Sequence, residues 1–255
     1  MNEFAEYILN EEDLISKMEL IYFLAPKLGI NFDKSIIFKT EIARIFLKYT
    51  KAKVDNNLVL TACLLCNCKK VDDAQKIGKL RTYAKEGAEH LAKLGFDERF
   101  CKICEGINRY SKISPREKES DILELIDQFG GMLIDRPERI GFAPDEALVL
   151  LEHRNLKGEY NRYLEIFRNF VETMEKVEIK GAVNTNVFAR LQKLIKESKD
   201  IPDFVKKLAY DYSISVDQKL AELEGKNNVL RKDQNRAMFS SEIEEKILKH
   251  MKKEN

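Results

Sequence analysis

The sequence predicts an all-α protein. Apolar residues recur at the spacing of helical turns along almost the whole 255-residue chain. The chain has only 11 glycines and 5 prolines, so tight turns should be few. No convincing strand pattern is present: residues 177–183 (VEIKGAV) could pair briefly, but one short strand cannot form a sheet. These observations indicate a long series of helices without an internal repeat.

Three helices are expected in the first quarter of the chain. An apolar stripe starts at Leu14, after a possible cap at Asn10, and stops at Gly29. A second helix should cover about 34–51, and a third about 57–67. The third reads LVLTACLLC and is apolar nearly all round, which places it at the centre of a bundle.

Further helices follow the same spacing to the end of the chain. Those expected before residue 157 cover about 80–94, 97–110, 115–129 and 144–156. Gly130-Gly131 should break the third of these and open a loop to Phe142. Those expected later cover about 159–176, 187–198, 201–213, 217–231 and 240–253. Aromatic stripes on the later helices should bury against their own domain, or alternatively form a homodimer or partner surface.

Composition excludes several classes of protein. Lys and Arg number 44 against 43 Asp and Glu, a net charge of +1, so nucleic acid is not an expected partner. No apolar run reaches the roughly 18–20 residues that cross a bilayer, so no membrane association is expected. The acidic N-terminus is unlike a signal peptide, and five cysteines favour reduced thiols. We therefore expect a cytoplasmic protein.

Residues 122–152 (ILELIDQFGGMLIDRPERIGFAPDEALVLLE) carry the most informative motif. They resemble the helix–loop–helix of HD-type phosphohydrolases, most closely the HD-GYP branch. The matching positions are Asp127, Phe129, Leu133, Asp135, Arg136, Pro137, Arg139, Pro144, Glu146, Ala147 and Leu148. The resemblance implies an HD-domain-like helical bundle over residues 1–157. Residues 158–255 would form a helical C-terminal extension, packed on the bundle or folded as a smaller second one.

The metal ligands of that family are almost all missing from this chain. HD enzymes bind divalent metals with histidines and aspartates, which polarise a phosphate and generate hydroxide. Their H-D-I-G-K motif corresponds here to Cys66-Asn67-Cys68-Lys69-Lys70, and the histidine of H-P-x-x-G corresponds to Tyr83. Of the predicted ligands only Asp127 remains, and none of His90, His153 and His250 matches a ligand position. The resemblance therefore implies an HD fold that has lost its reaction.

The five cysteines lie between residues 63 and 104, and two interpretations of them stay open. Cys66 takes the position of the first metal histidine, and Cys104 lies one turn before Asn108. Cys66, Cys104 and Asp127 are therefore candidate ligands for zinc, another divalent metal or an iron–sulfur cluster. Free cysteine is also commonly buried, and the first three cysteines belong to the predicted core helix or its end. We expect core cysteines and no cofactor.

Basic residues beside the lost metal site are retained. The resemblance places Lys70, Arg136 and Arg139 near Asp127, where basic groups can face a phosphate. These four residues are the predicted ligand site for a nucleotide or another phosphorylated small molecule, with a cyclic dinucleotide first to be tested. Alternatively, Arg136 pairs with Asp127 or Asp135 and holds the loop. Gly130-Gly131 would leave space beside Asp127, either as a pocket or as a tight turn.

The predicted function is a catalytically inactive HD-GYP-like protein that serves as a regulatory, ligand-binding or protein-interaction module. The alternative is a divergent metal-dependent phosphohydrolase or phosphodiesterase that uses Asp127 with substituted ligands. A third hypothesis is a scaffold in which the bundle only supports the C-terminal helices.

Overall fold

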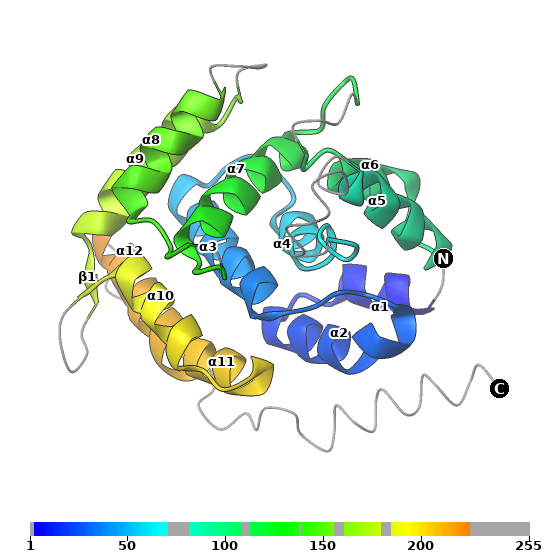
Figure 1. Ribbon diagram of the computed structural model, residues 1–255, viewed down its shortest axis with the longest axis horizontal. Helices are drawn as coiled ribbons and strands as arrows, with labels where there is room; N and C mark the ends of the chain where they lie inside the picture. The colour runs from blue at the N-terminus through cyan, green and yellow to red at the C-terminus, as the bar shows by residue number, and fades with distance from the viewer. Residues whose placement is uncertain are drawn as a thin grey trace.

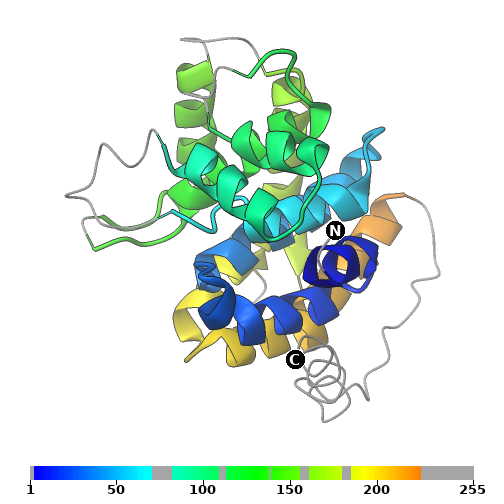
Figure 2. The same ribbon diagram turned by 90° about the vertical axis from the view of Figure 1, so that its right-hand side faces the viewer.

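A computed structural model describes residues 3–70, 82–108, 113–137, 139–155, 161–179 and 185–224 of the chain. Most of these residues are helical, which confirms the all-α prediction (Figures 1 and 2). None of the helices in these ranges is long and apolar enough to cross a membrane. The 157/158 boundary and the helix expected at 240–253 lie outside the described residues.

Three helices, α3 (Lys34–Thr50), α4 (Asn56–Leu65) and α7 (Lys118–Leu133), pack against one another at the centre of the bundle (Figure 1). The core helix expected from its apolar sequence is α4, and residues 61–65 are buried. Asp33 and Asp55 cap the starts of α3 and α4 by accepting backbone N–H groups. These caps fix where each helix begins, and therefore which of its side chains face the bundle interior.

Four further helices lie around α4, three of them in contact with it and the fourth packed on one of those three (Figure 1). They are α1 (Glu3–Asn10), α2 (Leu14–Leu28), α5 (Tyr83–Lys93) and α6 (Glu98–Glu105). The helix α1 was not expected, and Asp13 rather than Asn10 caps α2. Gly29 ends α2 in the left-handed conformation, as its position predicted.

The C-terminal elements form a second layer on α3 and α7 (Figures 1 and 2). They are α8 (Pro144–Asn155), α9 (Leu164–Lys176), β1 (Glu178–Ile179), β2 (Thr185–Asn186), α10 (Val187–Glu197), α11 (Ile201–Lys207), a π-helix η2 (Leu208–Tyr212) and α12 (Ser213–Leu223). Phe167 and Phe170 of α9 contact Phe46 of α3, with ring centroids 5.3 Å apart in both pairs. The aromatic stripes therefore bury against the chain's own core.

Two local predictions were wrong. Residues 178–179 pair with residues 185–186 as an antiparallel ribbon, so the VEIKGAV segment does find a partner strand. The pair Gly130-Gly131 does not break a helix, because α7 continues through it to Leu133. A Cβ at Gly130 would lie 2.8 Å from Cγ of Lys39, so this glycine serves close packing of α7 on α3.

Candidate functional site

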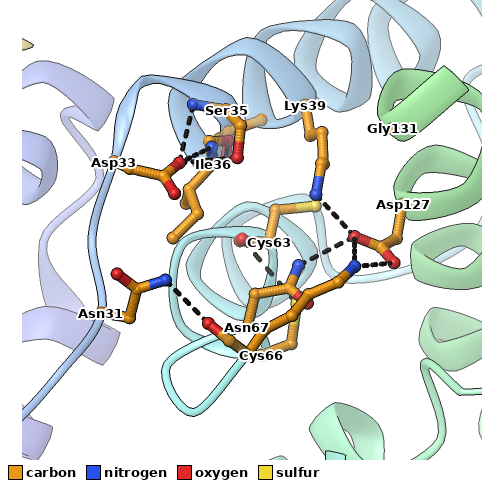
Figure 3. Close-up of polar contacts among 12 residues, drawn as sticks. Asn31, Asp33, Ser35, Ile36, Lys39, Cys63, Cys66, Asn67, Asp127 and Gly131 are labelled. Atoms are coloured by element: carbon orange, nitrogen blue, oxygen red, sulfur yellow. Dashed lines mark hydrogen bonds and ion pairs between the residues drawn. The ribbon is translucent and has the colours of Figure 1, made fainter. Parts of the chain in front are cut away.

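The carboxylate of Asp127 accepts hydrogen bonds from three nitrogen donors (Figure 3). Lys39 Nζ lies 2.8 Å and Asn67 Nδ2 lies 2.9 Å from Oδ1. Lys70 Nζ lies 3.0 Å from Oδ2 and 3.3 Å from Oδ1. Asp127 is 9% exposed, and the side chains of Lys39 and Lys70 are 7% and 13% exposed. Both oxygens of a buried carboxylate are therefore occupied by N–H donors.

Three segments that are far apart in the sequence bring these groups together. Lys39 lies in the second turn of α3 and Asp127 in the middle of α7. Asn67 and Lys70 follow the end of α4, where the Lys70 backbone N–H donates to the Asn67 carbonyl at 2.9 Å. The missing side chain at Gly130 lets the stem of Lys39 pass α7 and reach Asp127. The space that the sequence predicted beside Asp127 is therefore partly filled by a lysine.

The pKa shifts distinguish the ion pair of Asp127 and Lys39 from the second cation, Lys70. Burial opposes the charge of Asp127, but Lys39 and Lys70 hold the pKa of its carboxyl well below the usual range. Burial also opposes the charge of Lys39, yet Asp127 raises its pKa above the usual value. The pKa of Lys70 is lowered, because burial and the neighbouring Lys39 outweigh the effect of Asp127. One carboxylate thus neutralises Lys39 and leaves Lys70 as the less favoured charge.

Tyr83, at the start of α5, adds an aromatic wall to the cluster. The ammonium of Lys70 lies 5.0 Å from the centre of the Tyr83 ring, a cation–π contact. Burial and the nearby Asp127 raise the pKa of the Tyr83 hydroxyl well above its ordinary value. Both Asn67 and Tyr83 therefore lie near Asp127. They occupy positions at which the resemblance predicts metal ligands.

A pocket of about 240 Å³ opens beside this cluster. Lys39, Lys70 and Arg136 supply the basic groups of its wall. The other polar residues on the wall are Asn31, Asp33, Ser35, Asn67 and Asp135. The structure therefore brings three of the four predicted site residues together: Lys70 and Arg136 on the wall, and Asp127 behind them.

Arg136 is available to a ligand, whereas Arg139 is engaged elsewhere. Among the described residues the Arg136 guanidinium has no hydrogen bond or ion pair; Asp135, one of its expected partners, pairs with Lys196 at 3.0 Å. The Arg139 guanidinium donates to the backbone oxygens of Gly131 at 2.7 Å and Met132 at 2.9 Å. Arg139 thus binds carbonyls at the end of α7, which favours a structural role, and its predicted contact with ligand stays untested.

The cysteines belong to the core. All five are buried. Burial raises the pKa of Cys66 and Cys104 well above the ordinary value, that of Cys68 to about 12 and that of Cys101 to about 11. In the part of the chain that the structure describes, no three His, Cys, Asp or Glu side chains are grouped to hold a metal. The burial of all five cysteines therefore favours the core interpretation.

The divalent metal implied by the HD-domain resemblance does not fit the residues around Asp127. The carboxylate oxygens that would bind a cation already accept from two ammonium groups and one amide. Because Asn67 donates its NH₂ group to Asp127, its oxygen points away, and that buried oxygen has no hydrogen-bond partner among the described residues. Two lysine charges would also repel an arriving metal.

Neither of the two histidines in the described part of the chain belongs to a group that could hold a metal. His90 Nε2 lies 2.7 Å from the backbone oxygen of Leu28, and His153 lies on α8. The third, His250, lies outside the described residues.

Lys39 is the residue of the site that sequence reasoning missed. Its position carried a signal, because it lies three residues from both Ile36 and Ile42 on the apolar stripe of α3. A lysine within such a stripe is almost never buried unless it has a partner. The partner was not evident because Asp127 is 88 residues away in the sequence.

Comparisons of the chain with protein-family models, with curated proteins and with solved structures found no match. The HD-domain resemblance and its HD-GYP-like form therefore stay predictions, and the function must be argued from the site.

Proposed function

We propose that this protein is a regulatory module that binds a phosphorylated small molecule, without hydrolysing it, in the pocket beside Asp127. The observation that carries the proposal is an excess of basic groups at one site. Lys39, Lys70 and Arg136 line the pocket, whereas among the described residues Asp127 is the one carboxylate that is hydrogen-bonded to any of them. A buried excess of positive charge is costly, and an anion that enters the pocket relieves that cost.

The same contacts support a non-hydrolytic role. In an HD enzyme a carboxylate at this position would hold a metal that activates water. In this protein lysine ammonium groups occupy the oxygens of Asp127, so an internal cation takes the metal's place. The residues that remain can bind and orient an anion, and none of the five cysteines lines the pocket, where it could attack that anion.

Thermal unfolding of the purified chain with inorganic phosphate, nucleoside monophosphates and cyclic dinucleotides tests the binding. A compound present at 100 times its dissociation constant adds about 2.7 kcal/mol to the unfolding free energy, a shift that melting curves resolve. Arg136→Ala should abolish the shift, and Lys70→Met should reduce it. Arg190→Ala and Lys69→Met are the matched controls, because Arg190 lies on α10 and Lys69 donates to the Gly29 carbonyl at 2.6 Å. A shift that survives both pocket variants would reject this site.

Elemental analysis and a phosphatase assay with added Mn²⁺ address the enzymatic alternative. We expect no stoichiometric metal and no turnover. Bound metal together with activity, both lost in Asp127→Asn, would replace the proposal with the divergent phosphohydrolase.

A further inference from the structure

The number of positive charges without a carboxylate of their own at the pocket indicates which class of ligand it can bind. Asp127 neutralises one of the two lysines that share it. The other lysine and Arg136 remain without a carboxylate of their own among the described residues. Two positive charges are therefore left facing the same small space.

Neither of the two other carboxylates on the pocket wall is hydrogen-bonded to a basic group of that wall, although the charge of Asp33 acts on Lys39 and raises its pKa. Asp33 Oδ1 accepts from the backbone nitrogens of Ser35 at 2.8 Å and Ile36 at 3.1 Å, where it caps α3. Asp135 accepts from the backbone nitrogen of Gly141 at 2.7 Å and pairs with Lys196 at 3.0 Å. Both carboxylates stand beside the basic groups, so they would repel negative charge carried by a second part of a ligand.

The size of the pocket limits how much of a ligand can enter. Its volume of about 240 Å³ is below the roughly 300–1,000 Å³ of sites that enclose a whole drug-sized molecule. A single phosphate group with its first substituent fits such a volume, and the rest of the molecule would extend beyond the wall. A phosphate bridged on two sides needs an exit for both substituents and is at a disadvantage here.

We propose, on the basis of the binding function above, that the pocket is specific for a terminal phosphate monoester, a dianion, and discriminates against phosphodiesters, which carry one charge. The planar guanidinium of Arg136 can hold two phosphate oxygens, and the ammonium of Lys70 can hold the third. In a monoester all three terminal oxygens share the negative charge near neutral pH, since the second ionisation has a pKa of about 6. A diester offers two such oxygens and meets only one of the two unpaired charges.

Two matched pairs of probes test this specificity in calorimetric titrations of the full chain near pH 7.5, above the second ionisation of a monoester. The comparison of methyl phosphate with dimethyl phosphate changes the charge of the ligand with little change in its size. The comparison of AMP with 3′,5′-cyclic AMP changes the charge while the nucleoside stays the same. We expect each monoester to bind about tenfold or more tightly than its diester, because one unpaired buried charge is met only by the dianion.

Variants tie the preference to the two unpaired charges. Lys70→Met should reduce the ratio of monoester to diester affinity to about threefold or less, because one unpaired charge is removed. Lys69→Met should leave the ratio unchanged. If a diester binds as tightly as its monoester, and Arg136→Ala abolishes that binding, the specificity is wrong while the binding function stands. If inorganic phosphate and all four probes fail to bind, the specificity and the binding function both fall.

Discussion

Two buried charge clusters lie along α3, and they differ in how their charges are matched. In the first, Lys39 and Lys70 share the single carboxylate of Asp127. In the second, Arg44 pairs with Glu41 at 2.8 Å and with Asp217 at 2.6 Å, and Lys48, whose side chain is 48% exposed, pairs with Asp217 at 2.7 Å from the edge of the cluster. The second cluster therefore has as many carboxylates as cations.

The matched cluster has a structural explanation. Asp217 belongs to α12, and Ser213 at the start of α12 donates to Glu41 at 3.0 Å. These contacts fasten the last described helix to α3. Although burial opposes its charge, Glu41 and Asp217 raise the pKa of Arg44 well above its ordinary value, so the cluster is complete without any ligand. An unmatched cluster beside a pocket has no such explanation, and this difference supports the ligand site that we propose beside Asp127.

The largest expected effect comes from removing one cation from each cluster. Arg44→Met leaves Glu41 and Asp217 buried with too few donors, and should cost about 3–5 kcal/mol of unfolding free energy. Lys70→Met leaves a one-to-one pair of Lys39 and Asp127, and should cost about 1 kcal/mol or less. Urea unfolding at neutral pH measures both. Equal costs would show that Lys70 is as structural as Arg44 and would end the contrast between the clusters.

Removing the shared carboxylate should have a smaller but still large effect. Asp127→Asn leaves two buried lysines without a counter-charge, at a cost of about 3 kcal/mol. Adding Lys39→Met to this variant should recover about half of that loss, because one of the unpaired charges is gone. If the double variant is less stable than Asp127→Asn alone by the full cost of a second core substitution, Lys39 and Asp127 are not coupled.

The helices were predictable from the sequence because their signals are local. The apolar period and a capping aspartate place α3 at Lys34–Thr50, within a residue of the expected 34–51. The two-residue strands were missed because they are too short to show a pattern. The helix α1 was missed although Phe4, Ala5 and Ile8 form one buried face, because eight residues show a helical period only briefly. A glycine pair can end a helix or can make room for a neighbouring side chain, and the sequence alone does not distinguish the two. Here the neighbour is the side chain of Lys39, which lies 91 positions before Gly130.

The candidate site was predictable only in part. Asp127, Lys70 and Arg136 came from the motif resemblance, and the pocket contains or adjoins all three. Neither the partner of Lys39 nor the use of Arg139 on backbone carbonyls could be read from the sequence, because each depends on tertiary contacts. A resemblance indicates which positions along the chain correspond to a known site. The balance of charges at the pocket, on which the proposal rests, depends on contacts that only the folded structure shows.

Lys17 provides a third kind of buried charge, in which the partners are neutral. Its side chain is fully buried, and its ammonium donates to Asn57 Oδ1 at 2.6 Å and to the Thr61 hydroxyl. Burial lowers its pKa from 10.5 to about 8. Between these values the unfolded chain binds a proton that the folded chain lacks, so the contribution of Lys17 to stability rises with pH through this window.

Lys17→Met should therefore stabilise the protein below pH 8, by about 1–3 kcal/mol, and should remove this rise at higher pH. Urea midpoints of both proteins near neutral pH and near pH 9.5 measure the effect. Unlike the lysines of the pocket, Lys17 should show no dependence on phosphate. A variant that is destabilised at every pH would indicate that Lys17 remains charged and well bonded.

The smallest effect concerns the glycines that shape the unmatched cluster. Gly130→Ala would place a Cβ 2.8 Å from Cγ of Lys39, too close to the fixed end of that side chain to be relieved by a rotamer change. Gly131→Ala would place its Cβ 3.6 Å from the Arg136 guanidinium, an ordinary contact. Both positions lie inside α7, where alanine is favoured over glycine by about 1 kcal/mol. Gly131→Ala should therefore raise the unfolding free energy by about that amount, and Gly130→Ala should lower it by about 1–2 kcal/mol.

Because Gly130→Ala displaces Lys39 from Asp127, it should also weaken phosphate binding. Equal stabilisation by the two variants would mean that the position of the Lys39 side chain does not depend on the glycine.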